Sequence, residues 1–182
     1  KFIDLSFTDL DLLLRSNVHE HRFTALEILV MKYERAVAGD RDKIVGFYLK
    51  HTKRVNNWDL VDTSASYILG DYLVGQDWNI LRALAASKNI WERRIAIIAT
   101  AGFIRKDLFE PTLEIARLLL ADKHDLIHKA VGWMLREVGN RSLKDERKFL
   151  DAHHHSMPRT MLRYAIEKFP PEFRGYYIKK KK

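Results

Sequence analysis

The sequence feature that most constrains the fold is an internal repeat with a period of about 36 residues. Aligned at this period, the chain places five mostly small residues in one column: Ala25, Val61, Ala96, Gly132 and Ala165. Small residues at a regular spacing let successive helices pack closely, as they do in stacked helical repeats. Chance similarity among amphipathic helices is the alternative explanation of the column. We therefore expect a single-domain α-α superhelix, or α-solenoid.

The hydrophobic pattern predicts an all-α chain. Apolar residues recur at spacings of three and four, and the sequence has neither alternating runs nor hairpin turns. The spacing predicts helices over residues 8–15, 18–38, 41–53, 57–73, 78–87, 90–106, 111–121, 125–139, 143–154 and 158–169. Gly39 is expected to end one helix, Asp40 and Asn89 to cap the next ones, and Pro111 and Pro158 to occupy first turns.

Composition limits the class of protein. The chain has 182 residues, of which 47% are apolar and 31% charged, as in a soluble globular domain. Its longest apolar runs are shorter than the roughly 18 to 20 residues that a membrane span needs. It has no cysteine, which excludes disulfides, thiolate catalysis and cysteine-bound zinc and fits a reducing cytoplasm.

The net charge of +8 favours a polyanionic partner. Lys and Arg exceed Asp and Glu by 32 to 24, but four of these cations form the terminal run 179–182. Half of the net charge is therefore compatible with a solvated tail instead of a binding surface. We expect a repeat domain over residues 1–175, followed by a basic tail over residues 176–182.

The repeat predicts that four chemically informative side chains share one surface. Residues at offsets −3, −2 and +1 from the aligned column fall within about 100° of one another around a helix. Trp58 and Asp62 occupy −3 and +1 in one repeat, Arg94 occupies −2 in the next, and Trp133 occupies +1 in the third. Further cations lie on or near this face, namely Arg22, Arg93, Lys129 and Arg163. The pattern predicts a groove with one carboxylate, two indoles and a basic stripe.

Each of these residues also has an ordinary structural explanation. An aromatic side chain at helical spacing is commonly part of a core. Arg93 and Arg94 fit salt bridges on a solvated face as well as they fit clamps on phosphate groups. We interpret Asp59 as a charge that suits a helix N-terminus. Spacing alone leaves the role of the two arginines open.

The run His153–His155 suggests a metal site, but consecutive residues point in different directions around a helix and coordinate poorly together. Cationic residues at a helix C-terminus need no metal to explain them. The sequence has no glycine-rich phosphate loop, Walker motif or HExxH motif. We predict neither a metal nor a cofactor.

Four segments carry a resemblance to a known family. They are NNWDLVD from Asn56, NIWERRIAI from Asn89, KAVGWMLRE from Lys129 and MPRTMLRYAIEKF from Met157. Together they resemble the HEAT-like DNA alkylation repair family, the AlkD-type alkylpurine DNA glycosylases, in that family's order and over almost the whole chain. The first and third segments resemble those that carry the two active-site tryptophans of the family, and the second resembles the one with its phosphate-binding arginine.

The resemblance implies a hydrolase that releases cationic 3- and 7-alkylpurines from double-stranded DNA. It makes Asp62 the catalytic carboxylate, Trp58 and Trp133 aromatic walls, and Arg94 a backbone contact near the lesion. The expected DNA-binding residues are Arg94, Arg93, Arg22, Lys129, Arg159 and Arg163. It further implies a monomer of HEAT-like repeats in the bacterial cytosol or nucleoid, with DNA as the partner and no membrane association.

Two departures from the family pattern accompany this resemblance. The N-terminal helices of the family are expected to be partly missing, because the chain starts at Lys1 and is already in helical pattern by Phe7. A tandem tryptophan of the family is here Asn57 followed by Trp58.

Two alternatives remain at this level. One is a non-catalytic DNA-binding solenoid of the same family, against which the retained Asp62 argues. The other is a protein-interaction scaffold, which needs neither a basic stripe nor a carboxylate within it.

Overall fold

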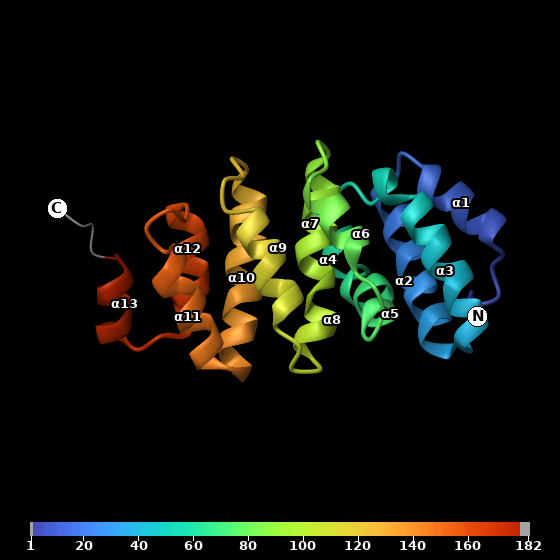
Figure 1. The fold of residues 1–182 in the computed structure, drawn as a ribbon. Helices are drawn as coiled ribbons and strands as arrows, with labels where there is room; N and C mark the ends of the chain where they lie inside the picture. Colours follow the sequence, from blue (N-terminus) through green and yellow to red (C-terminus); the bar gives the residue numbers. More distant parts are fainter. Residues whose placement is uncertain (1, 179–182) are drawn as a thin grey trace.

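The structure is a computed structural model that describes residues 2–178, and these residues form helices and no strand (Figure 1). The α-helices are α1 (Phe7–Arg15), α2 (His19–Arg35), α3 (Ala38–Lys50), α4 (Trp58–Asp62), α5 (Asp71–Leu73), α6 (Asn79–Ala85), α7 (Ile90–Ala99), α8 (Ala101–Ile104), α9 (Glu110–Leu118), α10 (Asp125–Arg141), α11 (Leu143–His153), α12 (Arg159–Ala165) and α13 (Pro171–Ile178). Two 3-10 turns, Thr52–Arg54 and Ile166–Lys168, and a π-helical segment, Ser66–Gly70, complete them. None of the helices in residues 2–178 is long and apolar enough to cross a membrane.

The helices stand side by side in chain order, with α1 at one end of the row and α13 at the other (Figure 1). One layer is formed by α2, α4, α7, α10 and α12, each of which contacts the next. The helices α1, α6, α9 and α11 pack against this layer, and buried apolar side chains form one continuous core. The arrangement is a two-layer helical array.

The aligned column of the repeat lies in the interior of this array. Ala25, Val61, Ala96 and Ala165 are each at most 1% exposed, and they lie on α2, α4, α7 and α12. Gly132 is buried on α10, and a Cβ built on it would meet the Met161 carbonyl oxygen of α12 at 2.4 Å. The whole column is therefore buried, and at Gly132 it marks a close approach of two successive helices of the layer, as the repeat predicts.

Several helix ends follow their sequence signals, and others do not. Asn89 caps α7 by accepting a hydrogen bond from the Trp91 N–H at 3.0 Å, and Pro111 lies in the first turn of α9, as expected. Gly39 and Asp40 were expected between two helices, but that prediction is wrong because α2 already ends at Arg35. Both residues lie in the first turn of α3. Pro158 precedes α12 as its N-cap.

The C-terminal part of the described chain contains a helix that the pattern missed. Residue 176, where the tail was expected to start, lies inside α13. Tyr177 of this helix is 2% exposed, and its hydroxyl donates a hydrogen bond to Asp151 Oδ1 at 2.8 Å. The boundary at residue 175 therefore cuts a packed helix. The remainder of the predicted tail, residues 179–182, lies outside the described residues.

The expected continuous helix over residues 57–73 is interrupted. After α4 the chain widens into the π-helical segment, in which the Gly70 N–H donates to the Ala65 carbonyl oxygen at 2.9 Å. A Cβ on Gly70 would meet the Ala99 carbonyl oxygen at 2.1 Å, so Gly70 lets this segment cross α7 and α8 closely. The wider turn changes the direction of the side chains that follow Asp62.

Candidate active site

The short helix α4 carries Trp58 and Asp62 one turn apart. Its N-cap is Asn57, whose side-chain oxygen accepts a hydrogen bond from the Trp58 N–H at 2.8 Å. Asp59 pairs with His19 Nε2 at 2.7 Å, which agrees with its interpretation as a structural charge at the helix start. The residue that replaces the first tryptophan of the tandem thus begins the helix that holds the candidate carboxylate.

A buried ion pair joins Asp62 to Arg94 of α7. Arg94 Nε and Nη2 donate to the two Asp62 carboxylate oxygens at 2.9 and 2.7 Å, and Arg94 Nη1 donates to the Leu126 carbonyl oxygen at 2.6 Å. Arg94 is only 5% exposed. Burial raises the pKa of Asp62, while the hydrogen bonds and the charge of Arg94 oppose this rise. A carboxylate is therefore held in fixed orientation at the edge of the interior.

Two concave regions of the surface meet at Trp133 of α10. The first, which we call the tryptophan hollow, has a volume of about 280 Å³. It is lined by Trp58, Arg94, Leu126, Lys129, Trp133, Arg136 and Tyr164. Trp58 is 54% exposed, so this indole presents much of its surface to solvent. An apolar ring beside cations is suited to a sugar or base next to a phosphate.

The second region, which we call the aspartate hollow, has a volume of about 460 Å³. Its lining comprises Asp62, Ser66, Tyr67, Ile98, Ala101, Ile104, Arg105, Trp133, Met134, Glu137, Asn140 and Arg141. Trp133 lines both hollows, and its Nε1–H donates to Glu137 Oε1 at 3.0 Å. The four groove residues predicted from the repeat register thus lie together, although they come from three helices.

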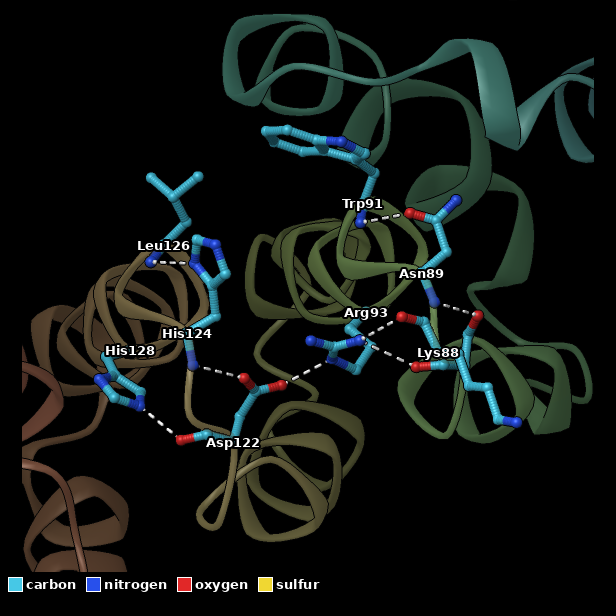
Figure 2. A network of polar contacts seen from close by, with 9 residues as sticks. Lys88, Asn89, Trp91, Arg93, Asp122, His124, Leu126 and His128 are labelled. Carbon is cyan, nitrogen blue, oxygen red and sulfur yellow. Dashed lines mark hydrogen bonds and ion pairs between the residues drawn. The ribbon is translucent and has the colours of Figure 1, made fainter.

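Arg93 and Arg94 face different surroundings. Arg93 Nε donates to Asp122 Oδ2 at 2.6 Å, and its Nη1 donates to the Ser87 and Lys88 carbonyl oxygens. Figure 2 shows Arg93 between the Lys88 carbonyl and Asp122, near the start of α10. Its side chain is 19% exposed, so most of Arg93 is committed to joining the turn before α7 to the turn before α10.

The other expected DNA-binding residues are spread along the array. Arg22 donates from Nη1 to the Ser16 carbonyl oxygen at 2.8 Å and is half-buried on α2. Lys129 lines the tryptophan hollow and pairs with Asp125 at 2.7 Å. Arg163 is exposed on α12, while Arg159 is exposed near the C-terminal end and donates to the Ile178 carbonyl oxygen at 3.1 Å. Of these four, the structure brings only Lys129 next to the tryptophans.

Sequence reasoning missed Tyr164 and Glu137. Tyr164 immediately precedes Ala165 of the aligned column and forms a further aromatic wall of the tryptophan hollow. Glu137 follows Trp133 by four residues, so the two lie on the same side of α10. The spacing signal was present for both, but nothing in the sequence distinguishes them from other residues of an amphipathic helix.

The histidine run at the end of α11 is engaged with its neighbours. The His153 ring lies 4.6 Å from that of Phe149, and His154 Nδ1 is 2.8 Å from the Leu150 carbonyl oxygen. Within residues 2–178, no three His, Asp or Glu side chains are grouped in a way that could hold a metal ion.

Both hollows lie within a region of the chain that matches a known family. The family model described as DNA alkylation repair enzyme matches residues 3–169, which include both hollows. The chain belongs to this family. Membership supports a role in the repair of alkylated DNA, with DNA as the partner, and the matched region ends before α13.

Among solved structures with a similar fold is an enzyme from the same field of repair. It is a predicted DNA alkylation repair enzyme from Enterococcus faecalis, with a TM-score of 0.70 and 14% sequence identity. The similarity covers 90% of this chain and 75% of that one. At this identity it concerns the fold alone. A search of curated proteins found no significant match.

Proposed function

We propose that the chain is a DNA glycosylase that hydrolyses the N-glycosidic bond of cationic 3- and 7-alkylpurines in double-stranded DNA. The observation that carries this proposal is the orientation of the Asp62 carboxylate by Arg94 beside Trp133. The two-layer array is interpreted as a HEAT-like solenoid, and the enzyme as an AlkD-type monomer of the cytosol. Family membership supports alkylated DNA as the substrate.

The chemistry suits a site with a single carboxylate. An alkylated purine already carries a positive charge, so it leaves as a neutral base when the electron pair of the glycosidic bond moves to its nitrogen. No general acid is needed for this departure. The sugar develops oxocarbenium character, which the negative Asp62 stabilises electrostatically. A water molecule then forms the new bond to the anomeric carbon and releases a proton, and Asp62 orients that water.

The two tryptophans would hold the sugar in this reaction. Indole faces are electron-rich and attract a developing positive charge or polarised C–H groups. Trp58 is exposed and lines the tryptophan hollow together with Arg94, and Trp133 lines both hollows. The damaged nucleotide is thus expected to bind against Trp58 and Trp133, with its anomeric carbon toward Asp62.

Arg94 acts on Asp62 in this proposal more than on DNA. Its guanidinium makes three hydrogen bonds inside the protein and is 5% exposed, which leaves little surface for a phosphate. A bidentate arginine fixes a carboxylate in one plane more strictly than a lysine does. We therefore assign Arg94 as the positioning residue of Asp62.

The test is release of 7-methylguanine from methylated duplex DNA. Asp62→Asn keeps the shape of the side chain and removes its charge, and we expect excision to fall about 10² to 10³-fold. DNA binding should be retained or become tighter, because a charge that repels phosphate is removed. Asp59→Asn on the same helix is the matched control, since Asp59 pairs with His19 and lines neither hollow.

Two outcomes separate the alternatives. If the wild-type protein binds duplex DNA but excises no base, the alternative hypothesis of a non-catalytic DNA-binding solenoid is favoured. An Asp62→Asn variant that excises at the wild-type rate would refute the role of the carboxylate and leave the Asp62–Arg94 pair as a structural ion pair.

A further inference from the structure

Five cationic side chains line the two hollows, and four of them are neutralised by carboxylates. The four ion pairs are Arg94–Asp62, Lys129–Asp125, Arg136–Glu167 and Arg141–Asp107. Arg105, which follows α8 and lines the aspartate hollow, forms no ion pair with any carboxylate of residues 2–178. Its side chain is exposed. Arg105 therefore contributes an uncompensated positive charge to the hollow that contains Asp62.

Neutral partners hold Arg105 in place. Its Nη2 donates to the Ser66 carbonyl oxygen at 2.8 Å, and its guanidinium carbon lies 5.3 Å from the centroid of the Tyr67 ring. Both partners belong to the π-helical segment, and Tyr67 is 47% exposed. A guanidinium has five N–H donors, so the Ser66 contact leaves donors for a ligand. The arginine is ordered without losing its net charge.

Arg105 and Asp62 line the same hollow, but Asp62 is paired with Arg94 and not with Arg105. The carbonyl oxygen that Arg105 binds belongs to Ser66, which follows Asp62 by four residues, or about one helical turn. DNA whose damaged nucleotide lies against Asp62 therefore passes close to Arg105 within the aspartate hollow.

We propose that Arg105, supported by Tyr67, binds a phosphodiester of the DNA that flanks the damaged nucleotide. The ligand class follows from the charge, because phosphate oxygens are the anions that duplex DNA presents to a groove. Arginine matches these oxygens with paired donors. This inference rests on the proposed function only in taking DNA as the partner, and it does not require base excision.

The experiment measures binding of an undamaged DNA duplex over a range of salt concentrations. For Arg105→Ala we expect weaker binding and a slope of log affinity against log salt that is smaller by about 0.9, as for one lost phosphate contact. Arg117→Ala is the matched control, because Arg117 is an exposed arginine on α9 that lines neither hollow. An Arg105→Ala protein with wild-type affinity and slope overturns the proposal.

Tyr67 variants test the support of the guanidinium. Tyr67→Phe keeps the ring and should bind the duplex as the wild type does, while Tyr67→Leu should weaken binding several-fold. In the Arg105→Ala background, Tyr67→Leu should cause no further loss, because its effect acts through the arginine. An undiminished loss in that background contradicts the supporting role of Tyr67.

Excision of 7-methylguanine is measured separately from this binding. A wild-type protein that binds duplex DNA through Arg105 but releases no base leaves the inference standing and refutes the glycosylase activity. A wild-type protein without salt-dependent duplex binding overturns the inference.

Discussion

At the residue scale, the Asp62–Arg94 pair makes the pH dependence of excision predictable. Burial raises the pKa of Asp62, and ionised Asp62 is the active form in the proposed reaction. The excision rate should therefore rise with pH through this pKa and then level off. Arg94→Lys replaces two parallel hydrogen bonds by a single ammonium group. This change should raise the pKa of Asp62 further and move the acidic limb of the rate profile to higher pH.

The measurement is the single-turnover excision rate against pH for the wild type and Arg94→Lys. Circular dichroism checks that the variant is folded, since breaking a buried ion pair destabilises a protein. Arg22→Lys is the control, because Arg22 is half-buried on the neighbouring α2 and contacts no part of Asp62. A profile whose acidic limb is the same in Arg94→Lys as in the wild type would show that Arg94 does not tune Asp62.

Two substitutions of Glu137 distinguish its role as a hydrogen-bond acceptor from the effect of its charge. It accepts the indole N–H of Trp133 at 3.0 Å and is itself held by Asn140, whose Nδ2 donates to Glu137 Oε2 at 3.1 Å. Glu137→Leu removes the acceptor and should lower the single-turnover excision rate about tenfold by misplacing the indole. Glu137→Gln keeps an acceptor oxygen and should restore most of the rate. Equal losses in both variants would mean that the charge of Glu137 matters and not the orientation of Trp133.

At the scale of the elements, the crossing of α10 and α12 depends on Gly132. A Cβ at this position would lie 2.4 Å from the Met161 carbonyl oxygen and 2.5 Å from Tyr164 Cβ. Gly132→Ala should therefore push α12 away and lower the free energy of unfolding by about 1 to 3 kcal/mol. Because Tyr164 lines the tryptophan hollow, DNA binding should weaken as well.

Gly46 of α3 supplies the matched control for Gly132. A Cβ at Gly46 meets nothing within 4 Å, so alanine there should raise the free energy of unfolding by about 0.5 to 1 kcal/mol through its better helix propensity. Urea unfolding of each variant against the wild type measures both changes in the free energy of unfolding. Stabilisation by Gly132→Ala would contradict the close packing of α10 on α12.

At the scale of the whole molecule, the order of the elements could be predicted from the sequence because it depends on local and periodic signals. The aligned column marked one buried residue on each of α2, α4, α7, α10 and α12, and Asn89 marked a cap. The interruption after Asp62 could not be predicted, because it arises where Gly70 meets the backbone of Ala99, 29 residues later. The short helix α13 escaped notice because only Tyr177 of its residues is buried.

The candidate site was predictable only as a set of residues on one face. Periodicity placed Trp58, Asp62, Arg94 and Trp133 together, but it could not show which cations are neutralised. The carboxylate that pairs with Arg93 is Asp122, which lies 29 residues away on a turn. Such pairing depends on side-chain positions across neighbouring helices. For the same reason, Arg105 did not stand out in the sequence, although it is the groove arginine that the structure leaves without a carboxylate among residues 2–178.

The stability of the whole molecule should fall as pH rises, because of one buried carboxyl. Glu146 of α11 is 1% exposed, and burial raises its pKa to about 8 from the ordinary 4.5, against a smaller opposing effect of Arg136. The folded state therefore binds this proton more tightly than the unfolded state does. The contribution of Glu146 to the free energy of unfolding is fully favourable below about pH 4.5, declines as pH rises to about 8, and is constant above that. At about 1.4 kcal/mol per pKa unit, the decline is on the order of 5 kcal/mol.

Glu146→Gln tests this dependence, since the amide has nearly the same shape and no charge to bury. Chemical unfolding is measured at about pH 5 and about pH 9. Between these pH values the variant should lose less stability than the wild type, and at about pH 9 the variant should be more stable than the wild type. Glu34→Gln, at an exposed position on α2, removes one negative charge without unburying a carboxyl and should leave the difference unchanged. If Glu146→Gln loses as much stability as the wild type between the two pH values, the buried carboxyl is not the titrating group.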